Sequence, residues 1–297
     1  MMEQTFDAAE RLAAETLIRL ALAEDLGTAG DLTCAALIRP EERAAVQVVA
    51  RTAGIVAGSP VGQMVFQSLD PSVSWSQEIE DGQPVGPGSV VATVSGSLKS
   101  LLIGERTMLN FMTHLSGIAT ITRRFVDAVH GTRASVLDTR KTLPGWRILE
   151  KYAVRCGGGT NHRMGLYDGV LIKDNHLAAW TESDSIAQAV RTARRKSPAG
   201  ISIEVEVDSL GQLRDALQGQ PDIVLLDNMN PAMLREAVIL RDQLAAGVLL
   251  EASGGVTLST VGEIAKTGVE RISVGGLTHS APALDLAFDW KSRISGR

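Results

Sequence analysis

The sequence contains few cysteine and few aromatic residues, and each shortage excludes a class of protein. Only Cys34 and Cys156 are cysteines among 297 residues. Two cysteines make neither a disulfide framework nor a metal cluster, and they fit a reducing compartment, so we expect both to be inert packing residues. Aromatic residues make up 4% of the chain, and the core should therefore be aliphatic.

Long apolar runs and an excess of basic charge are also missing. No apolar run reaches the roughly 20 residues that a membrane-spanning helix needs. The net charge is -5 and the pI is near 5.6, which argues against nucleic acid as the main partner. The first residues, MMEQTFDAAERL, are acidic and amphipathic rather than typical of a signal peptide. We therefore expect a cytoplasmic protein with no membrane segment.

The first 130 residues read as a helix, a small sheet and two further helices. Residues 7–24 carry leucines at helical spacing among alanines. From Ala44 onward, short alternating runs separated by Gly/Pro turns predict a mostly antiparallel sheet whose last strand ends at Gly96. Residues 98–129 then predict two helices joined near Ser116-Gly117.

After Thr132 the pattern becomes strand, then helix, repeatedly. The apolar runs are ASVLDT, GVLIKD, ISIEVEV, DIVLLDN, VLLEASG and RISVGG. Amphipathic segments lie between most of them, with start signals at Asp208-Ser209 and at Asn230-Pro231. A further β unit is expected around YAVRCGGG. This pattern predicts an α/β protein with parallel strands, arranged as an open doubly wound sheet or as a barrel. No GxGxxG follows the first strand, which disfavours a dinucleotide-binding domain.

Each apolar run ends in residues suited to binding or chemistry. These are Asp138-Thr139-Arg140-Lys141, Lys173-Asp174-Asn175, Glu206, Asp227-Asn228, Ser253-Gly254-Gly255 and Gly275-Gly276. Six such ends in succession are hard to explain as helix caps alone, and ligand sites of α/β barrels gather at the carboxyl ends of strands. The two glycine-rich ends predict a phosphate-binding nest, and the carboxylates of Glu206 and Asp227 suit ribose hydroxyls or Mg²⁺.

The stretch 138–176 is a cationic patch in an acidic protein. It holds seven Lys/Arg residues against four acids, together with His162 and His176. Clustered cations near flexible glycines indicate a site for a polyanionic small molecule. The alternative is a solvated basic helix face, which fits the four-residue spacing of Arg147, Lys151 and Arg155. A phosphoribosyl donor and an acidic acceptor together would use the cations, the carboxylates and the nest.

Several long motifs carry a resemblance to a known family. They are EDLG--GDLT, LLIGERTMLNFM-HLSGIAT, DTRKT-PG-R, EKYAVRCGGG-NHR-GL-D--LIKDNH, EVEVD, LLDNM, EASGG and ISVGGLTHS. Over nearly the whole chain the sequence resembles the quinolinate phosphoribosyltransferase family. It departs at Leu143-Pro144 followed by Trp146, where the family more often has Thr-Pro-Gly-Leu. The related ModD-type molybdenum-associated proteins share the fold but are less similar through RCGGGTNHR and LIKDNH.

The resemblance implies a two-part fold and a dimer. It implies an N-terminal α/β sandwich-like domain at residues 1–115, rejoined by residues 281–297, and an incomplete parallel α/β barrel at residues 116–280. It further implies a homodimer in which the partner's N-terminal domain completes each active site. The implied substrates are quinolinate and 5-phosphoribosyl 1-diphosphate, with Mg²⁺ and no organic cofactor.

The resemblance also assigns roles residue by residue. Lys141, Lys173, Glu206 and Asp227 would be catalytic, and Glu206 and Asp227 would hold Mg²⁺, directly or indirectly. The residues that would bind the two substrates are Arg106, Thr139, Arg140, Lys141, His162, Arg163, Lys173, Glu206, Asp227, Ser253, Gly254, Gly255, Gly275, Gly276 and His279. Arg106 would reach into the partner's site, although spacing alone would favour an exposed ion pair with Glu105.

Two rival functions use the same residues. A Schiff-base aldolase would use Lys173, which follows an apolar run as a barrel lysine would; its cationic neighbours are better explained by anion binding. A non-catalytic sugar-phosphate sensor would keep the glycine-rich nest. It would have no need for Arg106, Arg163 and the paired carboxylates together.

Overall fold

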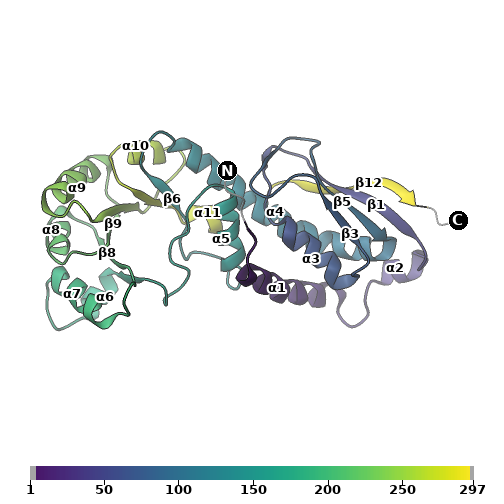
Figure 1. Cartoon of the computed structure of the whole chain (residues 1–297), viewed down its shortest axis with the longest axis horizontal. Helices are drawn as coiled ribbons and strands as arrows, with labels where there is room; N and C mark the ends of the chain where they lie inside the picture. The colour runs from purple at the N-terminus through teal and green to yellow at the C-terminus, as the bar shows by residue number, and fades with distance from the viewer. Residues whose placement is uncertain (1–4, 295–297) are drawn as a thin grey trace. The chain divides into compact units, whose positions relative to one another are not determined.

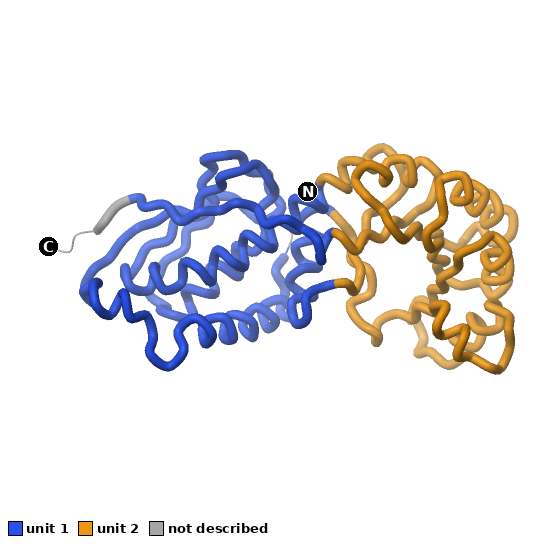
Figure 2. The backbone as a smooth tube through the Cα atoms, turned by 180° about the vertical axis from the view of Figure 1, so that it is seen from behind, with its two compact units in different colours: residues 1–123, 142–158, 277–297 blue, residues 124–141, 159–276 orange. Residues whose placement is uncertain are grey.

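The computed structural model describes residues 5–294, which form two compact units. Among these residues, the first unit holds those up to 123, then 142–158 and those from 277 onward; the second holds 124–141 and 159–276 (Figure 2). The segment 142–158 thus packs with the N-terminal part of the chain, although it lies between two strands of the second unit in sequence.

The first unit is built on a four-stranded antiparallel sheet in the order β12-β1-β5-β3. Its strands are β1 (Arg43–Ala50), β3 (Ser74–Gln77), β5 (Val90–Ser97) and β12 (Leu286–Ile294). A two-stranded ladder joins β2 (Gly54–Ile55) to β4 (Pro84–Val85). Because β12 pairs with β1 along its length, the last strand of the described residues belongs to the sheet of the first unit.

The first unit also contains helices, and the first of them begins as the sequence predicts. They are α1 (Ala8–Leu26), α2 (Leu32–Leu37), α3 (Ser59–Leu69), α4 (Leu98–Ala128) and α5 (Arg147–Cys156). Asp7 caps α1 in a reciprocal capping box with Glu10. Figure 1 shows α3 and α4 lying along the sheet of β1, β3 and β5.

The prediction of two helices between residues 98 and 129 is wrong, because α4 runs unbroken for 31 residues. Its Ser116-Gly117 pair serves packing. The Ser116 hydroxyl accepts a hydrogen bond from the Ala57 amide at 2.9 Å and donates to the Ala57 carbonyl at 3.1 Å. A Cβ at residue 117 would stand 2.2 Å from the Pro282 carbonyl oxygen, so only glycine fits there.

The segment YAVRCGGG is part of α5, so the predicted additional β unit is also wrong. The basic spacing that suggested a helix was correct, but its face is not solvated. Lys151 is fully buried and Arg155 pairs with Glu10. Trp146, which departs from the family pattern, stacks on Phe111 of α4 with ring centroids 4.8 Å apart.

The second unit is a six-stranded parallel sheet in the order β6-β11-β10-β9-β8-β7. Its strands are β6 (Ser135–Leu137), β7 (Val170–Ile172), β8 (Ile203–Val207), β9 (Ile223–Asp227), β10 (Leu249–Ser253) and β11 (Arg271–Ser273). These are the six predicted apolar runs. The edges of the sheet are β6 and β7, so the barrel is incomplete, and the predicted α/β fold class is confirmed.

Helices α7 (Ile186–Lys196), α8 (Leu210–Gln218) and α9 (Pro231–Leu244) lie on the outer side of the strands (Figure 1). Ser209 caps α8, and Asn230 caps α9 with Pro231 in its first turn, as predicted. Short helices complete the unit: α6 (Asp174–Ala179), α10 (Val261–Ala265) and the beginning of α11 (Gly276–His279). Among the described residues, no helix is long and apolar enough to span a membrane.

Candidate active site

The carboxyl edge of the parallel sheet collects most of the predicted site residues. Because β6 to β11 all run in one direction, the residues that end them meet at one edge of the second unit. This edge holds Thr139, Arg140 and Lys141 after β6, Lys173 after β7, Glu206 in β8, Asp227 in β9, Ser253, Gly254 and Gly255 at the end of β10, and Gly275 and Gly276 after β11.

Two carboxylates stand on neighbouring strands of this edge. The Glu206 carboxylate forms an ion pair with the Lys173 ammonium group, and its side chain is 15% exposed. Asp227 accepts a hydrogen bond from the Asn228 amide at 2.7 Å. Arg140 and Lys141 are exposed on the strand-end segment after β6. The edge thus offers both carboxylate ligands and cations to an incoming molecule.

The turn after β10 can be made only with glycine. Gly254 has φ +90°, and a Cβ there would stand 2.2 Å from Asn228 Oδ1. Gly255 also has positive φ, at +60°, with open space where a Cβ would be. Two successive left-handed glycines bring backbone close to whatever binds at the edge, which is how anion-binding nests are built.

The loop before β7 carries His162 and Arg163 and is attached to the end of β6. Asp138, fully buried, accepts hydrogen bonds from the His162 amide at 2.9 Å and the Asn161 side chain at 2.6 Å. The Arg163 guanidinium donates to the Gly169 carbonyl at 2.8 Å and is half-buried. Burial, and then the charge of Arg140, lower the pKa of Arg163. The Arg140 and Arg163 guanidinium groups are therefore close enough for each charge to influence the other.

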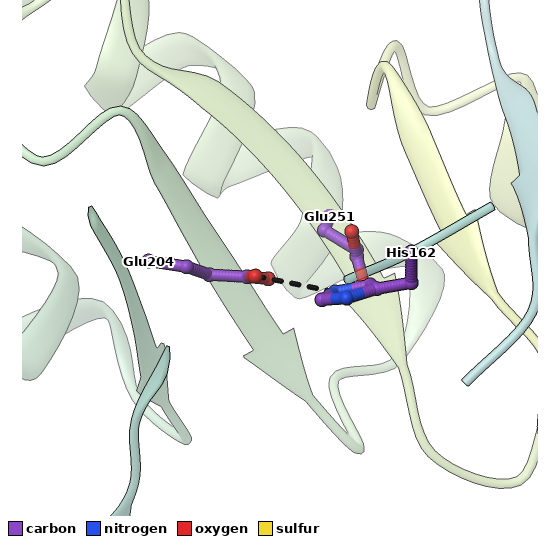
Figure 3. A group of neighbouring side chains, drawn as sticks. All are labelled: His162, Glu204 and Glu251. Carbon is purple, nitrogen blue, oxygen red and sulfur yellow. Dashed lines mark ion pairs between the residues drawn. The ribbon is translucent and has the colours of Figure 1, made fainter. Parts of the chain in front are cut away.

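The imidazole of His162 points inward, toward two buried glutamates (Figure 3). Its Nε2 lies 3.2 Å from Glu204 Oε2 and 3.4 Å from Glu251 Oε1. Its Nδ1 accepts a hydrogen bond from the Arg163 amide at 2.8 Å. The other Glu251 oxygen accepts from Arg271 Nε at 2.7 Å. Both ring nitrogens of His162 are thus engaged within the protein.

The donor atoms of His162, Glu204 and Glu251 lie within 4.8 Å of one another, a separation at which three ligands could hold a metal ion. The hydrogen bonding opposes that use. Because Nδ1 accepts from an amide, the neutral ring carries its proton on Nε2, and Nε2 then has no lone pair for a metal. A doubly protonated ring has none either. The cluster is therefore better described as a hydrogen-bonded support for the loop.

Charge within this cluster shifts all three pKa values. Burial, the largest influence, lowers the pKa of His162, but hydrogen bonds to Glu204 and Glu251 and their charges raise it to about 9. Burial raises the pKa of Glu204. Burial also acts to raise the pKa of Glu251, but His162 and Arg271 hold it below its usual range. A second proton on Nδ1 would break the hydrogen bond from the Arg163 amide, but the attraction of the two carboxylates for the doubly protonated ring outweighs that loss.

Glu204, Glu251 and Arg271 were not among the predicted site residues. A signal was present for the glutamates, since each is an acid inside an otherwise apolar strand. Glu204 stands two residues before Glu206, and Glu251 two before Ser253. The period-two alternation of strands places each pair on one face of its strand. The glutamates therefore lie one layer deeper than the strand-end residues.

Comparison with known proteins agrees with this architecture. Residues 31–116 match the model of the quinolinate phosphoribosyl transferase N-terminal domain, and residues 118–289 match that of the C-terminal domain. The chain belongs to the quinolinate phosphoribosyltransferase family. Members of this family are similar to it along nearly its full length. Nicotinate-nucleotide pyrophosphorylase (carboxylating) from Mycobacterium leprae is 45% identical over 279 residues, covering 93% of this chain and 97% of that protein.

A plant relative and a solved structure of the same family are also similar. A quinolinate phosphoribosyltransferase (decarboxylating) from Nicotiana tabacum is 40% identical, covering 92% of this chain and 81% of its own. The crystal structure of NadC from Streptococcus pyogenes superposes with a TM-score of 0.90 at 37% identity, covering 96% of this chain and 98% of that one. The predicted family is therefore confirmed.

Two predicted site residues of this family member lie in the first unit rather than at the strand ends. Arg106, on α4, is exposed, and its guanidinium has no hydrogen bond or salt bridge within residues 5–294. The exposed ion pair with Glu105 that spacing alone suggested is not formed there. His279, in α11, is also exposed, and its ring contacts the Ser280 hydroxyl at 2.6 Å. The roles of both residues stay predictions.

Proposed function

We propose that this protein transfers the phosphoribosyl group of 5-phosphoribosyl 1-diphosphate to quinolinate with decarboxylation, which yields nicotinate mononucleotide, diphosphate and carbon dioxide. It is a pentosyltransferase of pyridine nucleotide and NAD biosynthesis. The observation that carries this proposal is family membership over nearly the whole chain. The carboxyl edge of the second unit supports it, because carboxylates, cations and a glycine turn stand there together.

The donor would bind at the β8–β11 part of the edge. Glu206 and Asp227 would accept hydrogen bonds from ribose hydroxyls, and the glycine turn at Gly254-Gly255 would receive the 5′-phosphate. Ser253, Gly275, Gly276 and His279 would complete the phosphate site. Lys141 would face the diphosphate as a compact point charge, which suits a phosphate ligand.

The edge also fits a magnesium ion. Mg²⁺ in such sites takes one or two carboxylates together with substrate phosphates and water. Glu206 and Asp227 would supply those carboxylates from adjacent strands. The Glu206 carboxylate would then either leave its ion pair with Lys173 or contact both Lys173 and the metal ion. When bound, Mg²⁺ would neutralise charge on the departing diphosphate.

The acceptor would bind through its two carboxylates. Arg140, Arg163 and Lys173 would form charge-assisted hydrogen bonds to them, with Thr139 adding a hydroxyl beside the strand end. His162 would contribute as a member of the same loop. Since both its ring nitrogens are engaged inside the protein, it would turn to reach a ligand, or act through Arg163.

The chemistry then needs no organic cofactor. The C1–diphosphate bond breaks and leaves an oxocarbenium-like ribosyl centre, which the Glu206 and Asp227 carboxylates stabilise. The pyridine nitrogen lone pair forms the new bond to C1, and the ring becomes cationic. The C2–carboxylate bond then breaks, its electron pair remains on the ring carbon, and a proton from solvent replaces carbon dioxide. Holding two anions in line supplies much of the rate.

A homodimer with shared sites is part of the proposal. The exposed, unbridged guanidinium of Arg106 suits a residue that serves a partner's site.

A Schiff-base aldolase fits the geometry less well. The Lys173 amine forms an ion pair with Glu206, whereas a Schiff-base lysine must present a free amine to the carbonyl of its substrate. Borohydride trapping with a carbonyl substrate tests this directly. A covalent adduct on Lys173 would overturn the transferase role given to that residue.

The deciding experiment is an assay of purified protein with quinolinate, 5-phosphoribosyl 1-diphosphate and Mg²⁺, with nicotinate as the control acceptor. We expect carbon dioxide and nicotinate mononucleotide from quinolinate and no product from nicotinate. Absence of product from folded dimeric protein would retain the family and reject this substrate pair. Diphosphate release that depends on the acceptor would exclude a non-catalytic sugar-phosphate sensor.

A further inference from the structure

The first unit contains a large cavity that the proposed function does not use. Its volume is about 840 Å³, within the range of small-molecule sites. Every residue that lines it belongs to the first unit, from the loop before α1, α3, the β3–β4 region, α4 and the end of α5. The chain therefore forms this cavity without the strand-end residues of the second unit.

Arg123 faces this cavity, and no described residue pairs with it. Arg123 of α4 has no hydrogen bond or salt bridge within the described part of the chain, and it is half-buried. Its guanidinium lies against Gly158, where a Cβ would stand 3.3 Å from both terminal nitrogens. A side chain at position 158 would crowd the guanidinium, so the glycine leaves room for it.

The other charged groups of the cavity have hydrogen-bond or ion-pair partners, or are exposed to water. Arg155 pairs with Glu10 and lies over the Tyr152 ring. The Asp81 carboxylate accepts hydrogen bonds from the Gly58 amide at 2.6 Å and the Tyr152 hydroxyl at 2.8 Å, and from the Ser59 amide. Burial raises the pKa of Tyr152, which keeps that hydroxyl a donor.

Polar groups without partners converge on the same cavity. Ser59 is 3% exposed, and its hydroxyl has no hydrogen-bond partner among the residues that the structure describes. The amides of Gln63 and Gln83 are half-buried and make no side-chain hydrogen bonds among the described residues. A buried hydroxyl without a partner costs free energy, and a ligand that bonds to it removes that cost.

The remaining wall is aromatic. Trp75, Phe6 and Tyr152 line the cavity, and Phe6 meets Tyr152 edge to face with ring centroids 5.1 Å apart. The Trp75 indole N–H is held by Gln77 Oε1 at 2.6 Å, which fixes the ring. Rigid aromatic walls with one cation suit a planar ring that carries an acidic group. Glu80, also at the cavity, is exposed.

We propose that this cavity is a second ligand site that takes a small aromatic oxyanion, with the carboxylate or phosphate on Arg123, a hydrogen bond to Ser59 and the ring against Trp75. The site is independent of the proposed transferase reaction. It makes the first unit a place where an anionic metabolite can bind and influence the protein.

Benzoate and its neutral analogue benzyl alcohol test the proposal on the full-length protein. The four tryptophans give four indole N–H resonances in a ¹⁵N-correlated spectrum, and Trp75→Phe identifies the one from the cavity. We expect benzoate to move the Trp75 resonance saturably and benzyl alcohol at the same concentrations to leave it in place. No saturable shift, or equal shifts from both compounds, would overturn the proposal.

Matched variants test whether the guanidinium of Arg123 is the group that binds benzoate. Arg123→Gln is expected to weaken benzoate binding about tenfold or more, and Ser59→Ala about fivefold, because they remove a charge-assisted and a neutral hydrogen bond respectively. Arg124→Gln changes the next, exposed arginine of α4 and should bind like the wild type. The other indole resonances report that each variant is folded. Equal affinities for Arg123→Gln and Arg124→Gln would reject the assignment.

Discussion

His162 Nε2 lies 3.2 Å from Glu204 Oε2, and this contact links the loop before β7 to the interior of the barrel. In its neutral form the imidazole also accepts a hydrogen bond from the Arg163 amide at Nδ1, so a buried glutamate on β8 fixes the loop that carries a residue expected to bind the acceptor. The carboxylates of Glu204 and Glu251 raise the pKa of His162, and this shift couples the fold to pH.

Stability should fall as His162 loses its second proton. Because the pKa of His162 is raised in the folded protein from 6.5 to about 9, the stabilisation is complete below pH 6.5 and lost as pH rises through about 9. Urea unfolding at pH 6.5 and at pH 9.5 measures it. His162→Gln should lose less stability than the wild type over that window. Equal losses would show that His162 does not titrate there.

Arg163→Ala should weaken quinolinate binding by about 10- to 100-fold, since it removes a charge-assisted contact worth roughly 1.5–3 kcal/mol. The KM for quinolinate and direct titration calorimetry measure the effect. Arg214→Ala, which removes an exposed arginine of α8 in the same unit, is the control. Unchanged quinolinate affinity in Arg163→Ala would refute its role.

Mixing two inactive variants tests the shared site. Arg106→Ala and Lys173→Ala should each be inactive alone and regain activity when mixed, because one site of a mixed dimer keeps both residues. About a quarter of the wild-type activity is the upper limit for random exchange, since half the dimers are mixed and each has one intact site of two. If mass spectrometry shows subunit exchange and activity stays absent, the shared-site proposal fails.

Gly254→Ala should damage the phosphate turn. Its φ of +90° strains any other residue by about 1–3 kcal/mol, and the new Cβ would displace Asn228. We expect a lower melting temperature and a higher KM for 5-phosphoribosyl 1-diphosphate. Gly255→Ala meets no atom within 4 Å and should cost only the backbone term of about 1–2 kcal/mol. Equal losses of melting temperature in the two variants would show that the clash with Asn228 does not contribute.

Gly117→Ala should destabilise the first unit, since its Cβ would stand 2.2 Å from the Pro282 carbonyl oxygen. We expect a loss of about 1–3 kcal/mol in denaturant unfolding. Gly211→Ala is the control, because it lies in α8 with open space around it and should stabilise the helix by about 0.5–1 kcal/mol. An unchanged free energy of unfolding in Gly117→Ala would show that the backbone near Pro282 moves aside at little cost.

The sequence alone determined the features that depend on local order. Period-two and period-3.6 patterns placed the six parallel strands and most of their helices, and Ser209 and Asn230 marked two helix starts. Since parallel strands end at a common edge, the order of polar residues along the chain also predicted which ones meet.

Tertiary structure decided what depends on contacts distant in sequence. Gly117 looked like a break in α4, but a chain segment 165 residues away requires glycine there. Lys151 looked solvated and is fully buried. His162 looked directed at a ligand and points to Glu204 and Glu251. The periodicity of a sequence indicates which face of a helix or strand is apolar. It does not indicate which distant residue will cover a polar side chain, because that neighbour is brought there only when the chain folds.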